Sequence, residues 1–183
     1  MKFTMLLILL LASCGKQTKT KTELVEVAAP KAKQLECNVF DLGGAVPSVM
    51  PNFSTLSSLG IVEVESLNNA ATNNATAFPM LLGTKHESLL ERFGLVCEGK
   101  LNIELTGSYI FSVNSDDGSK LFINGIQVVT NDGSHAMTKK SGTIVLLKGV
   151  VNVKIEYFNG NGDKGLVFSM KRPNVAFEEL VKF

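Results

Sequence analysis

Two adjacent carboxylates are the residues best suited to chemistry in this 183-residue chain. Asp116 and Asp117 precede Gly118 between two apolar segments. Neighbouring carboxylates repel each other unless a cation or several hydrogen-bond donors offset their charge. The pair is therefore a candidate ligand for a hard cation such as calcium. Asp before Gly is also typical of a turn in which the side chains accept backbone amide protons, and the local pattern alone favours that second interpretation.

A second polar loop has the composition to complete such a site. Asn159-Gly160-Asn161-Gly162-Asp163 follows an apolar segment and contains two amides and a carboxylate. Calcium takes about six to eight oxygen ligands, so two aspartates need help from amides, backbone carbonyls or a hydroxylated ligand. We predict ligand-binding roles for Asn159, Asn161 and Asp163 beside Asp116 and Asp117.

A further acidic turn, at 131–135, offers fewer candidate functional residues. Asn131-Asp132-Gly133-Ser134-His135 is typical of an Asx turn. His135 and His86 are the two histidines of the chain, and neither has a nucleophile in a recognisable motif. Triads assemble across a fold, so spacing alone does not exclude one. The sequence contains no nucleophile elbow, phosphate-binding loop, zinc motif or dinucleotide fingerprint, and we predict a protein that is not an enzyme.

The elements around these loops have the side-chain period of β-strands. Tyr109, Phe111 and Val113 alternate with other residues before the aspartates, and Leu121 and Ile123 do so after them. Asn124-Gly125 predicts a type I′ hairpin turn, because both of its central residues need positive φ. Further strands are predicted for 143–147, 151–157 and 166–170. Leu101, Ile103 and Leu105 are expected to face one way, with a turn at Gly107. Such regular strands predict a sandwich or barrel.

The preceding segment gives weaker patterns. Strands are predicted at 38–42 and 62–64, and the polar run 68–76 is predicted to be a loop. Thr84-Lys85-His86-Glu87 fits a helix capping box, whereas 90–96 also fits a strand, and both interpretations remain open.

The amino terminus predicts export. Residues 1–13 contain a basic start, an apolar run and small residues, which is the pattern of a signal peptide. Leu11-Ala12-Ser13-Cys14 resembles a bacterial lipobox, which implies a lipoprotein acylated at Cys14 and anchored in the cell envelope, in the outer membrane if the cell is Gram-negative. A plain secretory signal with a chance cysteine is the alternative. Residues 14–36 are predicted to be the lipidated cysteine and a flexible tether, and 37–183 one folded domain.

Charge and cysteine content narrow the possible partners. The formal net charge is +1 and the arginines are Arg92 and Arg172, so nucleic-acid binding is not expected. Cys37 and Cys97 form an even pair in an exported chain and predict a disulfide. Two buried thiols are the alternative, and a metal site at these cysteines has little support without nearby histidines.

Several motifs of the second half resemble one family in order and spacing. They are Gly107-Ser108-Tyr109-Ile110-Phe111, Ser115-Asp116-Asp117-Gly118-Ser119, Leu121-Phe122-Ile123-Asn124-Gly125, Asn131-Asp132-Gly133, Leu146-Leu147-Lys148-Gly149 and Glu156-Tyr157-Phe158. Together they resemble the protective-antigen-type module, from about 93 to 173. The resemblance implies an all-β sandwich of jelly-roll or barrel character that binds carbohydrate.

The resemblance also implies a specific role for the aspartates. In yeast flocculins and epithelial adhesins, which are similar modules, two aspartates joined by a cis peptide bond hold calcium, and calcium contacts sugar hydroxyls. Asp116 and Asp117 match that pair, and Asn159 or Asn161 matches a further ligand by loop position. The chain has no Trp, so aromatic stacking on sugar would depend on Tyr or Phe. We therefore predict a non-catalytic, calcium-assisted glycan-binding module on a lipid-anchored envelope protein. The alternative is a structural or protein-interaction module in which the aspartates only stabilise the loop.

Overall fold

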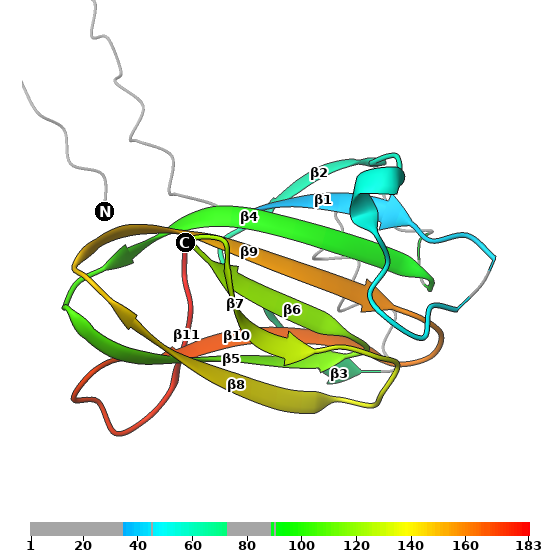
Figure 1. Ribbon diagram of the computed structural model, residues 1–183. Helices are drawn as coiled ribbons and strands as arrows, with labels where there is room; N and C mark the ends of the chain where they lie inside the picture. Colours follow the sequence, from blue (N-terminus) through cyan, green and yellow to red (C-terminus); the bar gives the residue numbers. More distant parts are fainter. Residues whose placement is uncertain (1–34, 45, 73–88, 90) are drawn as a thin grey trace, which may run out of the picture. The chain divides into compact units, whose positions relative to one another are not determined.

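Two antiparallel sheets lie face to face and enclose an apolar core (Figure 1). The computed structural model describes residues 35–44, 46–72, 89 and 91–183. The predicted signal peptide, Cys14, most of the predicted tether and the possible capping box at 84–87 lie outside the described residues. The described residues contain no helix that is long and apolar enough to cross a membrane.

Eleven strands and one short 3-10 helix, Phe53–Thr55, make up the regular structure of the described residues. The strands are β1 Leu35–Asp41, β2 Gly60–Val64, β3 Asn68–Thr72, β4 Phe93–Ile103, β5 Gly107–Asp116, β6 Ser119–Ile123, β7 Ile126–Asn131, β8 Thr138–Leu146, β9 Gly149–Asn159, β10 Lys164–Lys171 and β11 Glu179–Leu180. One sheet has the order β2-β1-β4-β9-β6-β7 and the other the order β11-β10-β5-β8, with β3 also paired to β10. The predicted β-sandwich is confirmed.

The core follows from the alternation of side chains along the long strands. Tyr109, Phe111 and Val113 of β5 are buried, as are Leu121 and Ile123 of β6. The rings of Phe111 and Phe168 stack with centroids 5.9 Å apart, which ties β5 to β10 inside the sandwich. Each large side chain that leaves water contributes about 1.5–3 kcal/mol, so this interior is the main source of stability.

Most predicted strands are present, and two expectations were wrong. The run 68–76 was predicted to be a loop, but Asn68–Thr72 forms β3, because an edge strand needs only main-chain hydrogen bonds to β10 and not an apolar composition. Leu105 was expected to share a face with Leu101 and Ile103, but it lies beyond the end of β4 and is 53% exposed. Strand β1 also begins at Leu35, so the predicted tether includes its first two residues. Asn124 and Gly125 have φ of 49° and 79°, as the predicted hairpin turn requires.

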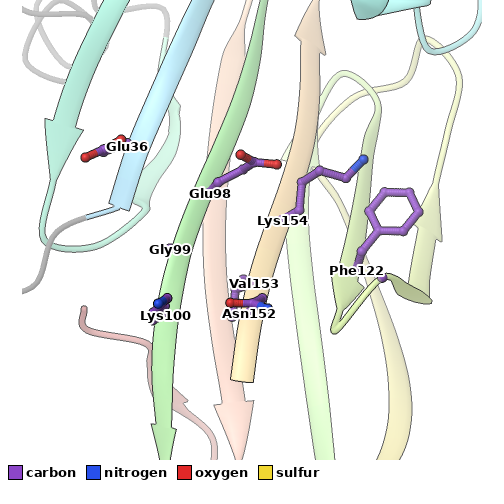
Figure 2. A pocket seen from close by; sticks show the side chains of 9 residues that line it. Glu36, Glu98, Gly99, Lys100, Phe122, Asn152, Val153 and Lys154 are labelled. Carbon is purple, nitrogen blue, oxygen red and sulfur yellow. The ribbon is translucent and has the colours of Figure 1, made fainter. Parts of the chain in front are cut away.

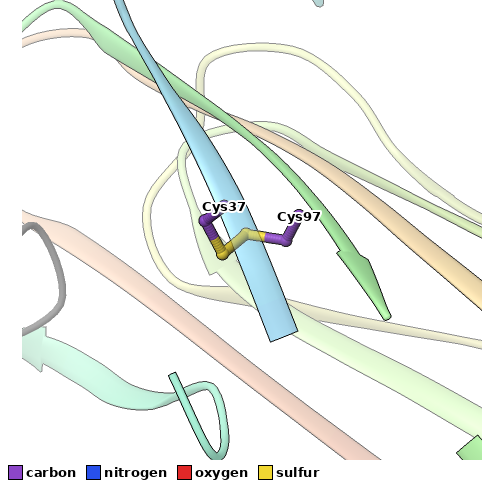
Figure 3. The surroundings of a disulfide bond; sticks show 2 residues. All are labelled: Cys37 and Cys97. Atoms are coloured by element: carbon purple, nitrogen blue, oxygen red, sulfur yellow. A yellow bond between two sulfur atoms is a disulfide. The ribbon is translucent and has the colours of Figure 1, made fainter. Parts of the chain in front are cut away.

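A disulfide joins the first strand to the centre of its sheet (Figure 3). Cys37 and Cys97 lie directly opposite each other on β1 and β4, and both are fully buried. The bond closes a loop across 60 positions of sequence. In the chain-entropy account, a loop of that length contributes about 4 kcal/mol by restricting the unfolded chain.

The sandwich has two ends with different chemistry. We call one the loop end: β5 and β9 finish there, at Asp116 and Asn159. We call the other the hairpin end: it holds the turn between β4 and β5 and the turn between β8 and β9 (Figure 1). All the predicted ligand-binding residues lie at the loop end.

Candidate functional site at the loop end

The aspartate pair occupies the tight connection from β5 to β6. Asp116 is the last residue of β5, and β6 begins at Ser119. The peptide bond between Asp116 and Asp117 is cis, the configuration that the resemblance implied. Both residues are only 7% exposed. Burial of two adjacent carboxylates requires strong compensation, since desolvation disfavours the charged form.

Asp117 obtains its compensation from two other loops. The backbone N–H of His135 donates to Asp117 Oδ1 at 2.9 Å, and the backbone N–H of Gly160 donates to Asp117 Oδ2 at 2.7 Å. The simple local cap would have used amides of its own turn. Asp117 instead holds the β7–β8 and β9–β10 loops against the β5–β6 connection, so its carboxylate is fixed on both oxygens.

Asp116 carries charge that is less well compensated. Burial, and then the charges of Asp117 and Asp163, raise the pKa of Asp116 above its ordinary value, although a backbone hydrogen bond from Met137 and the charge of His135 act in the opposite direction. The hydroxyl of Tyr157 donates to the Asp116 carbonyl at 2.6 Å and fixes its backbone. A cation beside Asp116 would reverse the direction of this pKa shift, because positive charge favours the carboxylate.

Asn159 contains a buried acceptor without a donor. The residue is 0% exposed, and its Nδ2 donates to the carbonyl of Gly160 at 3.1 Å. Among the described residues, no group donates to its Oδ1 atom. An unpartnered buried acceptor costs about 1–3 kcal/mol, and a bound cation would satisfy it. This observation is the strongest structural support for a ligand at this end.

The remaining predicted residues, Asp163 and Asn161, differ in burial and in their relation to the aspartates. Asp163 is partly buried and lies close enough to Asp116 to raise its pKa. Asn161 is exposed, and no contact joins it to the aspartates within the described part of the chain. The structure thus places Asp116, Asp117, Asn159 and Asp163 at the loop end.

Sequence reasoning missed the contribution of the segment 46–50. Met50 donates its backbone N–H to Asp132 Oδ1 at 2.6 Å, and Ser134 Oγ donates to the Pro47 carbonyl at 2.8 Å. A Cβ at Gly160 would lie 2.7 Å from Val46 Cγ1 and 3.2 Å from Asp117 Oδ2. Gly160 is therefore needed for this close approach, and glycine-rich composition was the only sequence feature that pointed to it.

Hydrogen bonds among buried polar side chains hold the two ends of the β7–β8 loop. Asn131 Nδ2 donates to Ser115 Oγ at 2.9 Å and to the Thr138 carbonyl at 2.8 Å. Ser115 and Ser119 share a hydrogen bond of 2.7 Å between their hydroxyls. Because both ends of the loop are held in this way, the amide of His135 is kept in position for Asp117.

The donor set fits calcium only with help from other oxygens. The described residues contain no group of three or more His, Cys, Asp or Glu side chains arranged to hold a metal. Two carboxylates and the Asn159 amide oxygen are hard ligands of the kind calcium takes, but they fall short of about six to eight. Backbone carbonyls, water or the hydroxyls of a bound ligand would have to complete the shell.

A separate groove lies on the outer face of the six-stranded sheet (Figure 2). Its volume is about 700 Å³, and Glu98, Phe122 and Lys154 line it side by side. Lys154 Nζ stands 4.3 Å from the centre of the Phe122 ring and pairs with Glu156 at 2.7 Å. The ammonium group therefore covers one face of the ring, and none of the predicted site residues lines this groove.

The fold and the loop end define a class: an all-β sandwich with a buried acidic pair between loops from both sheets. Residues 53–182 match the model of the PA14 domain. The match covers more than half of the chain, which belongs to the PA14 domain family. No curated protein sequence matches the chain.

Solved structures agree with this fold. The PA14 domain of MpAFP antifreeze protein is 15% identical, with a TM-score of 0.64 over 86% of this chain and 92% of that chain. The PA14 sugar-binding domain from an RTX adhesin is 16% identical, with a TM-score of 0.62 over 83% and 96%. The Epithelial Adhesin 9 A domain from Candida glabrata, solved in complex with Galb1-4GlcNAc, is 14% identical, with a TM-score of 0.63 over 83% and 88%. At these identities the likeness establishes the fold alone.

Proposed function

We propose that the domain is a non-catalytic, calcium-assisted glycan-binding module and that the loop end is its binding site. The observation that carries this proposal is the buried Asp116–Asp117 pair, together with an Asn159 Oδ1 atom that has no donor among the described residues. Asn159 directly precedes Gly160, whose amide donates to Asp117. Two repelling carboxylates and an unsatisfied acceptor all gain from one cation. Hydrogen bonds within the fold account for the Asp117 carboxylate, but they leave the Asn159 Oδ1 atom without a donor among the described residues.

The chain's own residues would hold and orient the ion. Asp116, Asp117 and the Asn159 Oδ1 atom would hold it, and the amides of His135 and Gly160 fix the Asp117 carboxylate in advance. When bound, calcium would neutralise the pair and accept oxygen ligands such as vicinal sugar hydroxyls. Exposed Asn161 and partly buried Asp163 would contact the sugar from the β9–β10 loop.

Two of the similar structures support a glycan as the ligand. One is named a sugar-binding domain, and the other was solved with a galactose-containing disaccharide. Both have the same fold as this chain. The proposal extends their ligand class to this chain on the strength of the acidic pair.

A glycan array tests the proposal. The full chain is applied in calcium and in chelator, and D116N is the matched variant because it keeps the side-chain shape and removes one charge. We expect glycan binding in calcium, its loss in chelator, and a large loss in D116N. Binding that is equal in calcium and chelator would contradict the calcium role, and the absence of binding to any glycan would contradict the function.

A second function has one specific observation in its favour. Both oxygens of Asp117 accept backbone amides from other loops, so the carboxylate has a structural role even without an ion. The alternative is a structural or protein-interaction module that presents the loop end to a protein. In that case D117N would lower stability without changing any glycan affinity.

We also propose that the mature protein is a lipoprotein of the cell envelope, acylated at Cys14. The support is the Leu11-Ala12-Ser13-Cys14 motif after an apolar run. Mass spectrometry of the amino-terminal peptide tests it. We expect a diacylglycerol-modified cysteine as the first residue, and an unmodified peptide would contradict the proposal.

A further inference from the structure

The hairpin end exposes aliphatic side chains on both of its turns. We call four of them the apolar rim: Leu105, Val145, Leu147 and Val150, which are 53%, 72%, 75% and 56% exposed. Leu105 lies in the β4–β5 turn and Leu147 in the β8–β9 turn. The two turns are joined, since the backbone N–H of Lys148 donates to Thr106 Oγ1 at 3.0 Å.

The rim surrounds the tip of the sandwich. Leu146 and Val151 are buried, so their neighbours Val145 and Val150 point to the outer faces of the two sheets. Ile103 pairs with Gly149 and Gly107 with Leu146, which places both turns at the same level (Figure 1). Apolar side chains therefore lie on both outer faces and at the tip between them.

Two carboxylates and two cations lie at this end. Glu104 and Glu179 share the guanidinium of Arg172, so these three side chains carry one net negative charge. Lys148, which is exposed next to Leu147, offsets that charge. A lysine beside an inserted leucine can keep its ammonium group at the level of lipid headgroups while its methylenes lie on apolar surface.

The chain enters the domain toward this end. Strand β1 is antiparallel to β4, with Glu36 opposite Glu98, so Leu35 lies on the side of Glu36 that faces the end of β4 at Ile103. Thirty-four residues precede Leu35. The sequence predicts an anchor at Cys14, which lies 21 positions before Leu35. Such an anchor would join the domain through Leu35, on the side of the hairpin end.

We propose that the apolar rim inserts into the lipid headgroup region and docks the domain on the membrane surface. A second copy of the chain is the competing occupant, and the fluorescence measurement below distinguishes it from lipid. Insertion of a few aliphatic side chains next to a lysine is the kind of contact that interfacial binding uses. The proposal does not depend on the glycan site, and it uses the proposed anchor only to explain why a membrane is near.

Tryptophan fluorescence tests the docking directly, because the chain has no Trp. The full chain carrying L147W is compared with V49W, whose site at the loop end is 62% exposed. With vesicles that contain anionic lipid, we expect a blue shift and quenching by brominated lipid for L147W and neither for V49W. An L147W spectrum unchanged by vesicles would overturn the proposal. A blue shift that needs no vesicles and grows with protein concentration would also overturn it, in favour of self-association.

A partition measurement gives the size of the effect. The full chain with C14S lacks the acylation site but keeps the apolar run 5–11. The difference in vesicle binding between two such chains therefore reports on the side chains that differ between them. Each leucine removed from lipid should lower the partition coefficient roughly tenfold. We therefore expect a roughly hundredfold loss for L105S/L147S, which removes two leucines, and little change for V49S/L59S, whose side chains are similarly exposed elsewhere. Equal partitioning of the two double variants would overturn the proposal.

Mass spectrometry of Cys14 separates this proposal from the anchor. A lipidated chain that floats with vesicles while the L147W indole stays in water overturns docking and leaves the anchor. An unlipidated chain whose L147W indole still inserts supports docking and contradicts the anchor.

Discussion

The loop end and the hairpin end lie at opposite ends of the same strands, and they differ in which kind of side chain is buried and which is exposed. At the loop end, carboxylates are buried and are held by amides from distant loops. At the hairpin end, leucine and valine side chains are exposed on two short turns. Our proposals assign each end a different contact outside the domain: an ion and a glycan at the loop end, and a lipid surface at the hairpin end.

Loss of the disulfide should produce the largest effect, and it should affect stability rather than either end. C37S/C97S removes the cross-link between β1 and β4, and the free energy of unfolding should fall by up to about 4 kcal/mol. Chemical denaturation of the oxidised chain and of the variant measures this. Calcium affinity should stay the same while the variant is folded, because the bond lies away from the aspartates. A change in affinity with no change in stability would contradict this division.

Removal of the Asp117 carboxylate should weaken the loop end in two ways. D117A leaves the buried amide of Gly160 and the part-buried amide of His135 without an acceptor, which costs about 1–3 kcal/mol for the buried amide and less for the other. Calcium binding should also be abolished. Urea unfolding and a calcium titration measure the two effects. An unchanged unfolding free energy would show that the carboxylate does not hold the two loops.

N159A should separate ion binding from folding. The substitution removes an acceptor that has no donor in the described part of the chain, and it also removes the hydrogen bond from Nδ2 to the Gly160 carbonyl. These two changes act in opposite directions, so without calcium the stability should change by no more than about 1 kcal/mol. Calcium affinity should fall at least about tenfold. The matched control is N152A, an exposed asparagine on the same strand. Equal calcium affinities in N159A and N152A would remove Asn159 from the site.

The smallest expected effect is on the pH dependence of stability, and it comes from Glu178, which lies away from both ends. Burial alone would raise the pKa of Glu178, but hydrogen bonds from Lys139, Ser169 and Ser112 hold it below the usual value of 4.5. A lowered pKa means that this carboxylate stabilises the fold above pH 4.5 and that the contribution is lost as the pH falls through its folded pKa. For this partly exposed ion pair, the contribution should be below about 1 kcal/mol. Unfolding free energies of E178Q and of the unaltered chain should converge at low pH, and a constant difference would contradict this assignment.

The sequence was sufficient to predict the β-sandwich, because apolar side chains alternate along most of the strands. Tyr109, Phe111 and Val113 show the alternation directly, and the Asn124-Gly125 turn defines a hairpin. Strand β3 was missed because it has no apolar alternation, and only its pairing with β10 makes it a strand. Pattern along the chain cannot reveal pairing that depends on the backbone alone.

The site was predictable only in part. The composition of the loops indicated Asp116, Asp117 and Asn159, and the fold brings these residues to one end. The local pattern did not indicate that the amides of His135 and Gly160 would bind Asp117, since these residues lie 18 and 43 positions away. Nor did it reveal the segment 46–50, which only the three-dimensional fold places against the acidic loops.

Calcium binding by the full chain tests the central claim most directly. Isothermal titration calorimetry at neutral pH with calcium, and with magnesium as the competing ion, measures ion binding by the chain. It needs no assumption about the sugar. We expect one calcium site per chain that survives excess magnesium, because a flexible set of carboxylate and amide oxygens suits the larger ion. The absence of heat with calcium, together with unchanged stability in chelator, would show that Asp116 and Asp117 hold only the protein's own loops.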